Sequence, residues 1–354
     1  MSKAELRQRV ADHPRPRVAA LTARVEGLAD TRTPLTAFGF LVAIGLACLV
    51  AAMVPVGPSW LDGVGAVVVA ATYSWALAAR TGGRPVLFGS LAVVVGVVAL
   101  VSDVDVLRTG AAVGTCVVAA VLGVMATVPA VTFSRAAREC AIALSIGIVG
   151  ALATIGFEPA ITVTRFEYTT FGLALAAAFF VVYRLGAGLH GLGRRGIVIV
   201  VIGGVLLVVT LLYAELLRRY GESGLVASLL DVVRWSRDHV GAFPRPIEAV
   251  LGVPALAYGC HMRARRRQGW WVCAFGVAAT SAAANALANP EIAFTEAGLS
   301  LFYGLIIGLG LGYLMIRLDV ILTGGSAGSR GRRSRVAEEA SALRPEPARS
   351  AALL

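Results

Sequence analysis

Long apolar runs alternate with short polar segments along most of the chain. About ten runs approach the ~20 residues that a helix needs to cross a bilayer. They lie at 37–55, 60–79, 85–101, 110–132, 140–157, 169–187, 196–214, 247–262, 269–288 and 296–316. Because backbone polar groups in lipid must bond within their own segment, such runs favour helices. The pattern predicts an all-α, polytopic integral membrane protein with about ten transmembrane helices.

The connections between these runs alternate in charge. Every second one is basic, and together these carry Arg80, Arg84, Arg135, Arg138, Arg184, Arg194, Arg195, Arg263, Arg265, Arg266 and Arg267. Most of the remaining connections are neutral or acidic. Lys and Arg collect in cytoplasmic loops, so both termini are predicted to be cytoplasmic.

Polar segments flank the predicted membrane domain of residues 37–316. Residues 1–36 are basic with apolar positions at helical spacing, which is typical of a cytoplasmic interfacial helix. No short apolar region with a small-residue cleavage site follows, so we expect no removable signal peptide. Residues 317–354 are rich in Gly, Ser and Arg and then in Pro, Ala and Glu, which predicts a disordered, basic cytoplasmic tail.

Composition supports a membrane location and narrows the partners. The chain is 57% apolar and 15% charged, beyond the usual range of soluble domains. Its net charge of +11 would suggest nucleic acid in a soluble protein, but basic cytoplasmic loops account for it, and no nucleic-acid partner is predicted. Arginine replaces lysine everywhere except Lys3, which favours a bacterial source and therefore the cell membrane.

Residues that serve in metal sites and common catalytic motifs are scattered. The five cysteines and four histidines fall on different segments without metal-ligand spacing, so neither a metal site nor a disulfide framework is predicted. The chain lacks a phosphate-binding P-loop, a G-x-S-x-G elbow and an H-E-x-x-H motif, and no cofactor is expected. No ionisable residue lies near the middle of a predicted span, which disfavours proton-driven antiport.

The largest polar segment between spans is residues 216–245, predicted to be an outer amphipathic helix. Positive charge is disfavoured in loops on the outer side of the membrane, so the arginines of this helix must have a specific role there. They either pair with nearby acids or hold an anionic ligand such as an anionic lipid or a polyprenyl phosphate. The candidate substrate-binding residues are Arg218, Arg219, Arg234, Arg237, Arg245, Glu215, Glu248 and His239.

The span after this segment contains helix breakers. Pro254 and Gly252 interrupt residues 247–262, and Pro254 must leave a backbone carbonyl without its helical partner. Broken helices line binding sites in many transporters, although kinks also serve packing. We therefore place the candidate site at the outer mouth between the seventh and eighth spans.

Small and polar residues repeat every four positions in the last two spans. These candidate helix-packing residues are Ser281 and Asn285 in the ninth span and Ser300, Gly304, Gly308 and Gly312 in the tenth. Such faces let helices approach closely, so we expect the two spans to pack together with Asn285 bonded to a neighbouring helix. The alternative is that the polar stripe lines a transport pathway.

Ten spans, cytoplasmic termini and an enlarged outer loop between the seventh and eighth spans resemble the layout of the cell-wall polymerases of the shape, elongation and division group. The span count also resembles the drug/metabolite transporter superfamily. The first resemblance implies sugar transfer from a polyprenyl-diphosphate lipid with an outer acid such as Asp231 or Asp238 as base, and the second implies alternating access. The sequence favours a transporter or flippase of an anionic or amphipathic, lipid-linked substrate. A membrane-embedded transferase and a non-catalytic scaffold that binds other membrane proteins stay open.

The predicted topology can be tested by cysteine labelling in a background without the native cysteines. A cysteine at Ser223 should react with an impermeant maleimide in intact cells, whereas cysteines at Gly82 and Gly193 should react only after permeabilisation. Labelling at Gly82 in intact cells would contradict the ten-span arrangement.

Overall fold

The computed structural model describes residues 33–54, 57–160, 162–187, 197–198, 200–209, 212, 223–265, 269–324 and 346–353. All regular elements in these ranges are helical. They are α3 (Thr33–Met53), α4 (Leu61–Arg80), α5 (Pro85–Val101), α6 (Asp105–Met125), α7 (Phe133–Ile155), α8 (Val163–Val182), the π-helix η1 (Tyr183–Ala187), α10 (Ser223–Val240), the π-helix η3 (Glu248–Gly252), α11 (Val253–Arg263), α12 (Gly269–Ala274), α13 (Val277–Leu287) and α14 (Phe294–Gly324).

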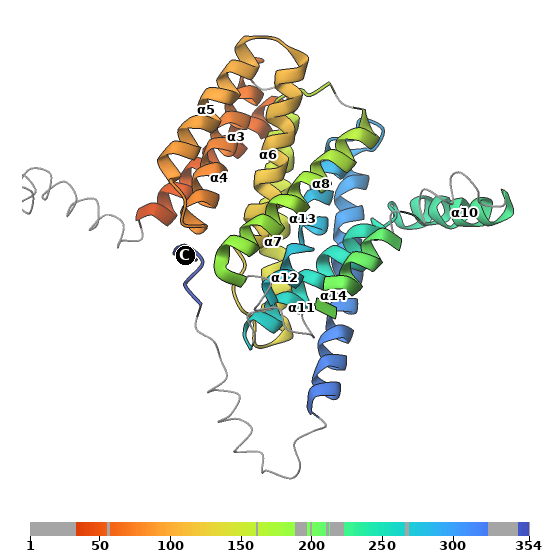
Figure 1. Ribbon diagram of the computed structural model, residues 1–354. Helices are drawn as coiled ribbons and strands as arrows, with labels where there is room; N and C mark the ends of the chain where they lie inside the picture. The colour runs from red at the N-terminus through yellow and green to blue at the C-terminus, as the bar shows by residue number, and fades with distance from the viewer. Residues whose placement is uncertain are drawn as a thin grey trace, which may run out of the picture.

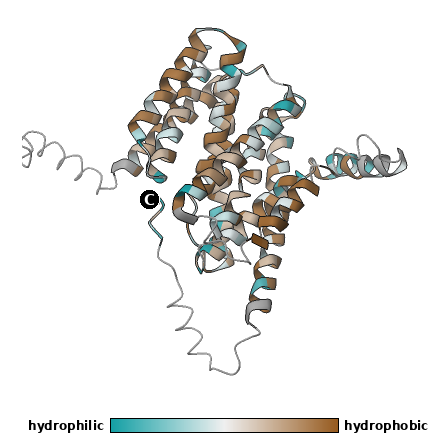
Figure 2. Ribbon diagram, viewed as in Figure 1, coloured by the Kyte–Doolittle hydropathy of each residue, from teal (hydrophilic) through white to brown (hydrophobic). Residues whose placement is uncertain are grey.

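Seven helices in the described part of the chain are long and apolar enough to cross a membrane. They are Leu35–Met53, Leu61–Arg80, Asp105–Met125, Phe133–Ile155, Val163–Leu185, Gly269–Leu287 and Phe294–Ile321. The all-helical architecture and its long brown, apolar ribbons fit a polytopic membrane protein (Figure 2). Within the described residues the other three predicted spans contribute shorter helices: α5, the helix Val200–Val209, and η3 with α11. The described part of the chain thus contains seven candidate spans where the sequence predicts ten.

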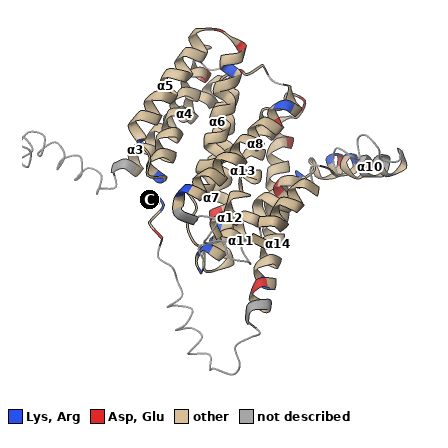
Figure 3. Cartoon of the chain, viewed as in Figure 1, with Lys and Arg blue, Asp and Glu red and all other residues tan. Residues whose placement is uncertain are grey.

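Successive long helices run antiparallel and form a bundle with two distinct ends (Figure 1). We call the end where α4, α6 and α11 finish the lower end, and the end where α5 and α7 finish the upper end. Charged residues of the bundle gather mainly near these ends (Figure 3). At the upper end, Arg108 pairs with Asp103 at 2.8 Å and with Glu158 at 3.1 Å. This distribution is what an apolar slab around the middle of the bundle requires.

The core of the bundle lies around α11, α12 and α13. Every residue of α11 and α12 is buried, as are ten of the eleven residues of α13. Alanines make up much of α13, so its neighbours come very close: a Cβ on Gly147 of α7 would lie 2.7 Å from the carbonyl oxygen of Thr280. Small residues therefore place α13 inside a ring formed by α6, α7 and α8.

The small-residue face of α14 packs against η3 and α11. A Cβ on Gly304 would lie 2.7 Å from the Glu248 carboxyl carbon, and one on Gly308 would lie 2.5 Å from the Val253 Cβ. Gly312 meets Ala257 in the same way, and the Ser300 hydroxyl donates to the Phe243 carbonyl at 2.7 Å. We predicted that the last two spans pack together, and α14 does contact α13: Ala283 and Ala286 share a buried cluster with Ala297 and Leu301. The glycine face of α14, however, lies against η3 and α11.

Two irregular helical segments lie next to each other. The chain stays helical from residue 246 to Arg263, and the irregularity predicted near Pro254 takes the form of the π-helix η3, which runs directly into α11. A break at Phe275 and Gly276 separates α12 from α13. The two places touch, because a Cβ on Gly252 would overlap the Ala279 backbone nitrogen and one on Gly276 would lie 2.7 Å from Leu256 Cδ1.

The chain end returns to the bundle. Helix α14 continues to Gly324, beyond the predicted boundary at 316, and residues 346–353 lie at the lower end near α3 and α4 (Figure 1). The Leu353 N–H donates to the Arg80 carbonyl at 2.8 Å. The described end of the expected disordered tail is therefore packed against the bundle. Residues 1–32 and 325–345 lie outside the described residues, so the interfacial helix and the basic cluster of the tail stay predictions.

Two glycines of α14 offer a matched test of the packing. Gly308→Ala places a methyl group within 2.5 Å of the Val253 Cβ, whereas a Cβ on Gly310 meets nothing within 4 Å. Overpacking costs about 1–3 kcal/mol, so Gly308→Ala should lower the melting temperature in detergent by several degrees. Gly310→Ala should leave it unchanged. Equal melting temperatures for the two variants would contradict the contact between α14 and α11.

Candidate functional site

The candidate site residues of the polar segment fall in three groups. Glu215, Arg218 and Arg219 lie outside the described residues, so their roles stay predictions. Arg234, Arg237 and His239 lie on α10, which projects sideways from the bundle (Figure 1). Arg245 and Glu248 lie at the entry to the broken span.

The α10 arginines have acidic neighbours but stay accessible. Arg234 pairs with Asp231 at 3.3 Å, and both side chains are about 70% exposed. Arg237 pairs with Glu296 of α14 at 2.8 Å, and its side chain is 51% exposed. The His239 ring stacks on Trp235 and its Nδ1 lies 2.9 Å from the Trp235 carbonyl oxygen. Exposed pairs of this kind contribute about 0–1 kcal/mol, so they leave both arginines free to exchange partners.

Arg245 is held more firmly. Its guanidinium donates through Nη2 to the Asn285 carbonyl at 3.1 Å and lies 3.9 Å from a Glu167 carboxylate oxygen. We call Arg245, Glu248, Glu167 and Asn285 the Arg245 cluster. It joins α8, α13 and the entry to η3 at one point.

Glu248 is the first residue of η3 and is fully buried, yet neither carboxylate oxygen has a hydrogen-bond partner in the described structure. Its carboxyl group lies against Gly304, ten residues past the start of α14. At 1.5 Å per residue, this is about 15 Å along that helix, close to half the thickness of a bilayer core. Burying a carboxylate without a partner is costly, so the group needs a proton or a cation there.

The sequence predicts that every ionisable residue lies toward an end of its span, and Glu248 does stand at the end of its own span. Its carboxyl group nevertheless lies beside Gly304, near the middle of the predicted span 296–316. The residues before it also run along α14, because Tyr303 donates to the Val240 carbonyl at 2.9 Å and Ser300 to that of Phe243 at 2.7 Å. The end of one span is therefore placed against the interior of another.

The polar stripe of α13 borders the Arg245 cluster. Asn285 accepts a hydrogen bond from Thr170 of α8 at 3.2 Å, which confirms the expected bond to a neighbouring helix, and Ser281 donates to Val277 of its own helix. Both residues also line a small pocket with Glu167, Tyr168, Phe171 and Ile247. The stripe thus serves packing and also lies on a cavity beside a buried charge.

A second charged cluster lies at the lower end, where the sequence analysis places only loop arginines. Three arginines donate to consecutive carbonyls at the end of α6: Arg80 to Met125, Arg349 to Ala126 and Arg263 to Thr127, at 3.0–3.1 Å. Arg263 also pairs with Glu346 at 2.6 Å and lies 3.4 Å above the Trp270 ring, and Arg349 pairs with buried Glu139 at 2.7 Å. Cations stabilise a helix C-terminus, so this cluster caps α6.

The described residues offer no group of His, Cys, Asp or Glu side chains that could hold a metal ion. Comparison with known proteins gives no further guide, because no family model, no curated protein and no solved structure matches the chain.

The α10 arginines can be tested together. The double variant Arg234→Gln and Arg237→Gln should keep the melting temperature nearly unchanged, because the pairs are exposed. If the two arginines hold an anionic headgroup, native mass spectrometry should show reduced retention of phosphatidylglycerol, and the difference from the parent should shrink at high salt. Arg317→Gln, which removes an exposed arginine from the other end of α14, is the control. Unaltered retention with a clear fall in melting temperature would contradict a binding role.

Proposed function

We propose that this protein is a transporter or flippase that carries an anionic or amphipathic, lipid-linked substrate across the cell membrane. In this proposal α5, the helix Val200–Val209 and the pair η3–α11 also cross the membrane, which gives ten spans with both termini in the cytoplasm. The single observation that supports it best is the buried Glu248 carboxyl, which has no hydrogen-bond partner among the described residues and lies in the π-helix η3.

A π-helix that packs against a helix break supports a moving part. In many transporters, discontinuous helices bring free backbone groups to a substrate site near the bilayer midplane. Here η3–α11 and α12–α13 touch at Gly252 and Gly276, next to the Arg245 cluster. π-turns such as η3 also occur preferentially at functional sites.

The charges of the Arg245 cluster suit an anionic substrate. Arg245 has a modest 3.9 Å contact with Glu167 and one bond to a backbone carbonyl, so a phosphate or carboxylate that accepts two hydrogen bonds would be a stronger partner. An ionisable group at membrane depth marks a substrate or proton pathway in most membrane proteins. Glu248 would then exchange a proton when the neighbouring arginine changes partner.

Helix α10 supports a substrate that arrives from the membrane surface. Its Val232 and Trp235 side chains are exposed, and Arg234 and Arg237 share the same helix. An amphipathic helix with these residues binds at an interface and attracts anionic headgroups. A lipid-linked substrate would meet α10 first and the Arg245 cluster afterwards.

Reconstitution into liposomes tests the proposal. The probe is phosphatidylglycerol with a fluorescent acyl chain, and its arrival in the outer leaflet is measured by dithionite quenching, with and without a pH gradient. The parent protein should move this probe faster than the phosphatidylcholine equivalent. Arg245→Gln should slow it by roughly tenfold, the equivalent of 1.4 kcal/mol, and Glu248→Gln should remove the effect of the gradient.

Arg317→Gln serves as the control, because that exposed arginine lies far along α14 from the Arg245 cluster. Its rate should equal the parent rate. If the parent moves neither the phosphatidylglycerol probe nor a fluorescent polyprenyl phosphate, the transport function is wrong. Equal rates for Arg245→Gln and the parent would remove the cluster from the pathway.

A further inference from the structure

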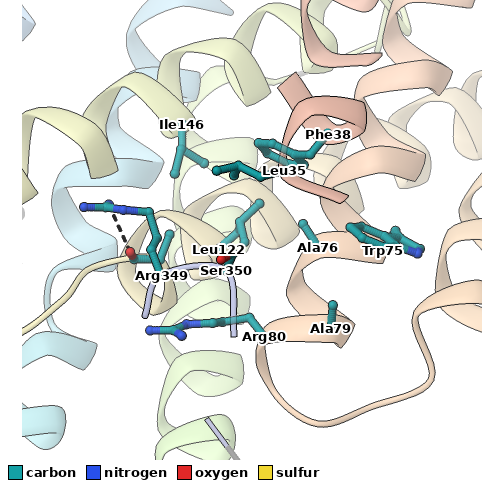
Figure 4. Close-up of a pocket in the computed structure, with 11 residues that line it drawn as sticks. Leu35, Phe38, Trp75, Ala76, Ala79, Arg80, Leu122, Ile146, Arg349 and Ser350 are labelled. Atoms are coloured by element: carbon teal, nitrogen blue, oxygen red, sulfur yellow. Dashed lines mark hydrogen bonds between the residues drawn. The ribbon is translucent and has the colours of Figure 1, made fainter. Parts of the chain in front are cut away.

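An apolar cavity lies near the lower end of the bundle, among helices α3, α4, α6 and α7 (Figure 4). Its walls are Leu35, Phe38, Trp75, Ala76, Leu122 and Ile146. Arg80 and Arg349 stand at its edge together with Ser350 (Figure 4). The walls are apolar, as a bound hydrocarbon chain requires, and the edge supplies positive charge.

The C-terminal segment Glu346–Leu353 covers this edge. Arg80 donates through Nη1 to the carbonyls of Ala348 and Ala351, at 2.6 and 2.5 Å, and the Leu353 N–H returns a bond to the Arg80 carbonyl. Arg349 from the segment reaches Ala126 and Glu139, and Glu346 pairs with Arg263. Residues far apart in sequence therefore close the mouth of the cavity.

The segment satisfies the charge of Arg80 only in part. The Arg80 side chain is 4% exposed, yet no carboxylate among the described residues pairs with it, and its Nη2 has no hydrogen-bond partner there. A buried guanidinium normally takes a bidentate acid, since two parallel bonds to a carboxylate or phosphate are stronger than bonds to neutral carbonyls. Arg80 thus keeps an unused donor at the edge of an apolar cavity.

We propose that the cavity and Arg80 form a binding site for an amphipathic anion, a molecule with one apolar chain and a carboxylate or phosphate headgroup. The chain occupies the cavity and the headgroup accepts from Nη1 and Nη2 of Arg80. The segment Glu346–Leu353 is a tethered cover that such a ligand displaces. This site lies at the opposite end of the bundle from Glu167 and α10, so it does not depend on the transport proposal.

The contacts of the cover suit displacement. Its bonds to Arg80 come from backbone carbonyls, which an anionic headgroup replaces with stronger charged bonds. When the segment leaves, Arg349 leaves Glu139, but Glu139 keeps Arg138 at 3.0 Å and the Val128 N–H at 3.0 Å. Arg263 keeps Thr127 and the Trp270 ring. The bundle therefore retains partners for its own buried charges.

Binding of oleate to the protein in nanodiscs of zwitterionic phosphatidylcholine tests the site. Truncation after Pro345 should tighten oleate binding by roughly tenfold because the cover no longer competes. Arg80→Gln in the truncated chain should remove that gain, whereas Arg135→Gln, which changes an exposed arginine at the same end, should not. If truncation prevents folding, Glu346→Gln in the full chain tests the same point, since it weakens the bond to Arg263 and should also tighten binding.

Three further probes define the ligand class. Oleyl alcohol, which lacks the charge, should bind at least tenfold more weakly than oleate. Inorganic phosphate should compete with oleate if the headgroup subsite binds an anion that has no apolar chain. Nanodiscs that contain phosphatidylglycerol should weaken oleate binding if bilayer lipid fills the site. Equal binding of oleate and its alcohol would overturn the proposal.

Displacement of the cover is measured separately. A bimane label on Ser350→Cys lies at the same cavity as Trp75, whose indole should quench it. Oleate should raise the fluorescence, and the rise should vanish in Trp75→Phe, where nothing quenches the label. Unchanged fluorescence at saturating oleate, with no effect of truncation on affinity, would show that the segment is a permanent cap of α6.

Discussion

The structure depends on how closely other helices approach the short segment η3–α11. Every residue of α11 is buried, so α11 has no face for lipid and must be surrounded by protein. Gly304, Gly308 and Gly312 remove side chains from the face of α14 that covers it, and Gly276 does the same beside Leu256. A methyl group at these contacts would meet an atom at less than 3 Å. Close contact between helix backbones, more than the amount of buried apolar surface, determines which helices pack at the centre of the bundle.

That central position also explains why charge is found at depth. The segment is too short to start at the surface and finish at the lower end, so the residues before it descend beside α14. Glu248 reaches a fully buried position beside Gly304, whereas the Arg245 side chain before it stays 18% exposed. Glu167 and Asn285 meet Arg245, but no side chain of the described structure bonds to Glu248. A buried carboxylate without a bonded partner lowers the stability of a purely structural core. It is expected where a proton or a substrate supplies the missing partner.

Local signals in the sequence predicted the helices and an irregularity near Pro254, because apolar length and helix breakers act within one segment; the irregularity is a π-helix and not an interruption. They also indicated that the face from Ser300 to Gly312 lies against another helix. They could not identify that helix, since α11 and α13 both offer small residues. The depth of Glu248 was out of reach for a similar reason: it is set by the path of residues 240–247 along α14, which no periodicity in those residues encodes. The pairing of Arg234 and Arg237 with acids was one of the two explanations open from sequence, and the structure contains both pairs without testing the other.

The C-terminal segment shows a different limit of sequence reasoning. Its Pro, Ala and Glu content is typical of disorder, and its two bonds from Arg80 end on backbone carbonyls that any residue could supply. The contacts that depend on side-chain identity are those of Glu346 and Arg349. Glu346 pairs with the buried Arg263, and Arg349 pairs with the buried Glu139. A permanent cap would gain by pairing Arg80 with an acid as well, because a buried guanidinium on neutral carbonyls forgoes charged bonds. The segment instead holds Arg80 with weaker groups beside an apolar cavity, which is the arrangement expected of a cover that a stronger anionic partner can replace.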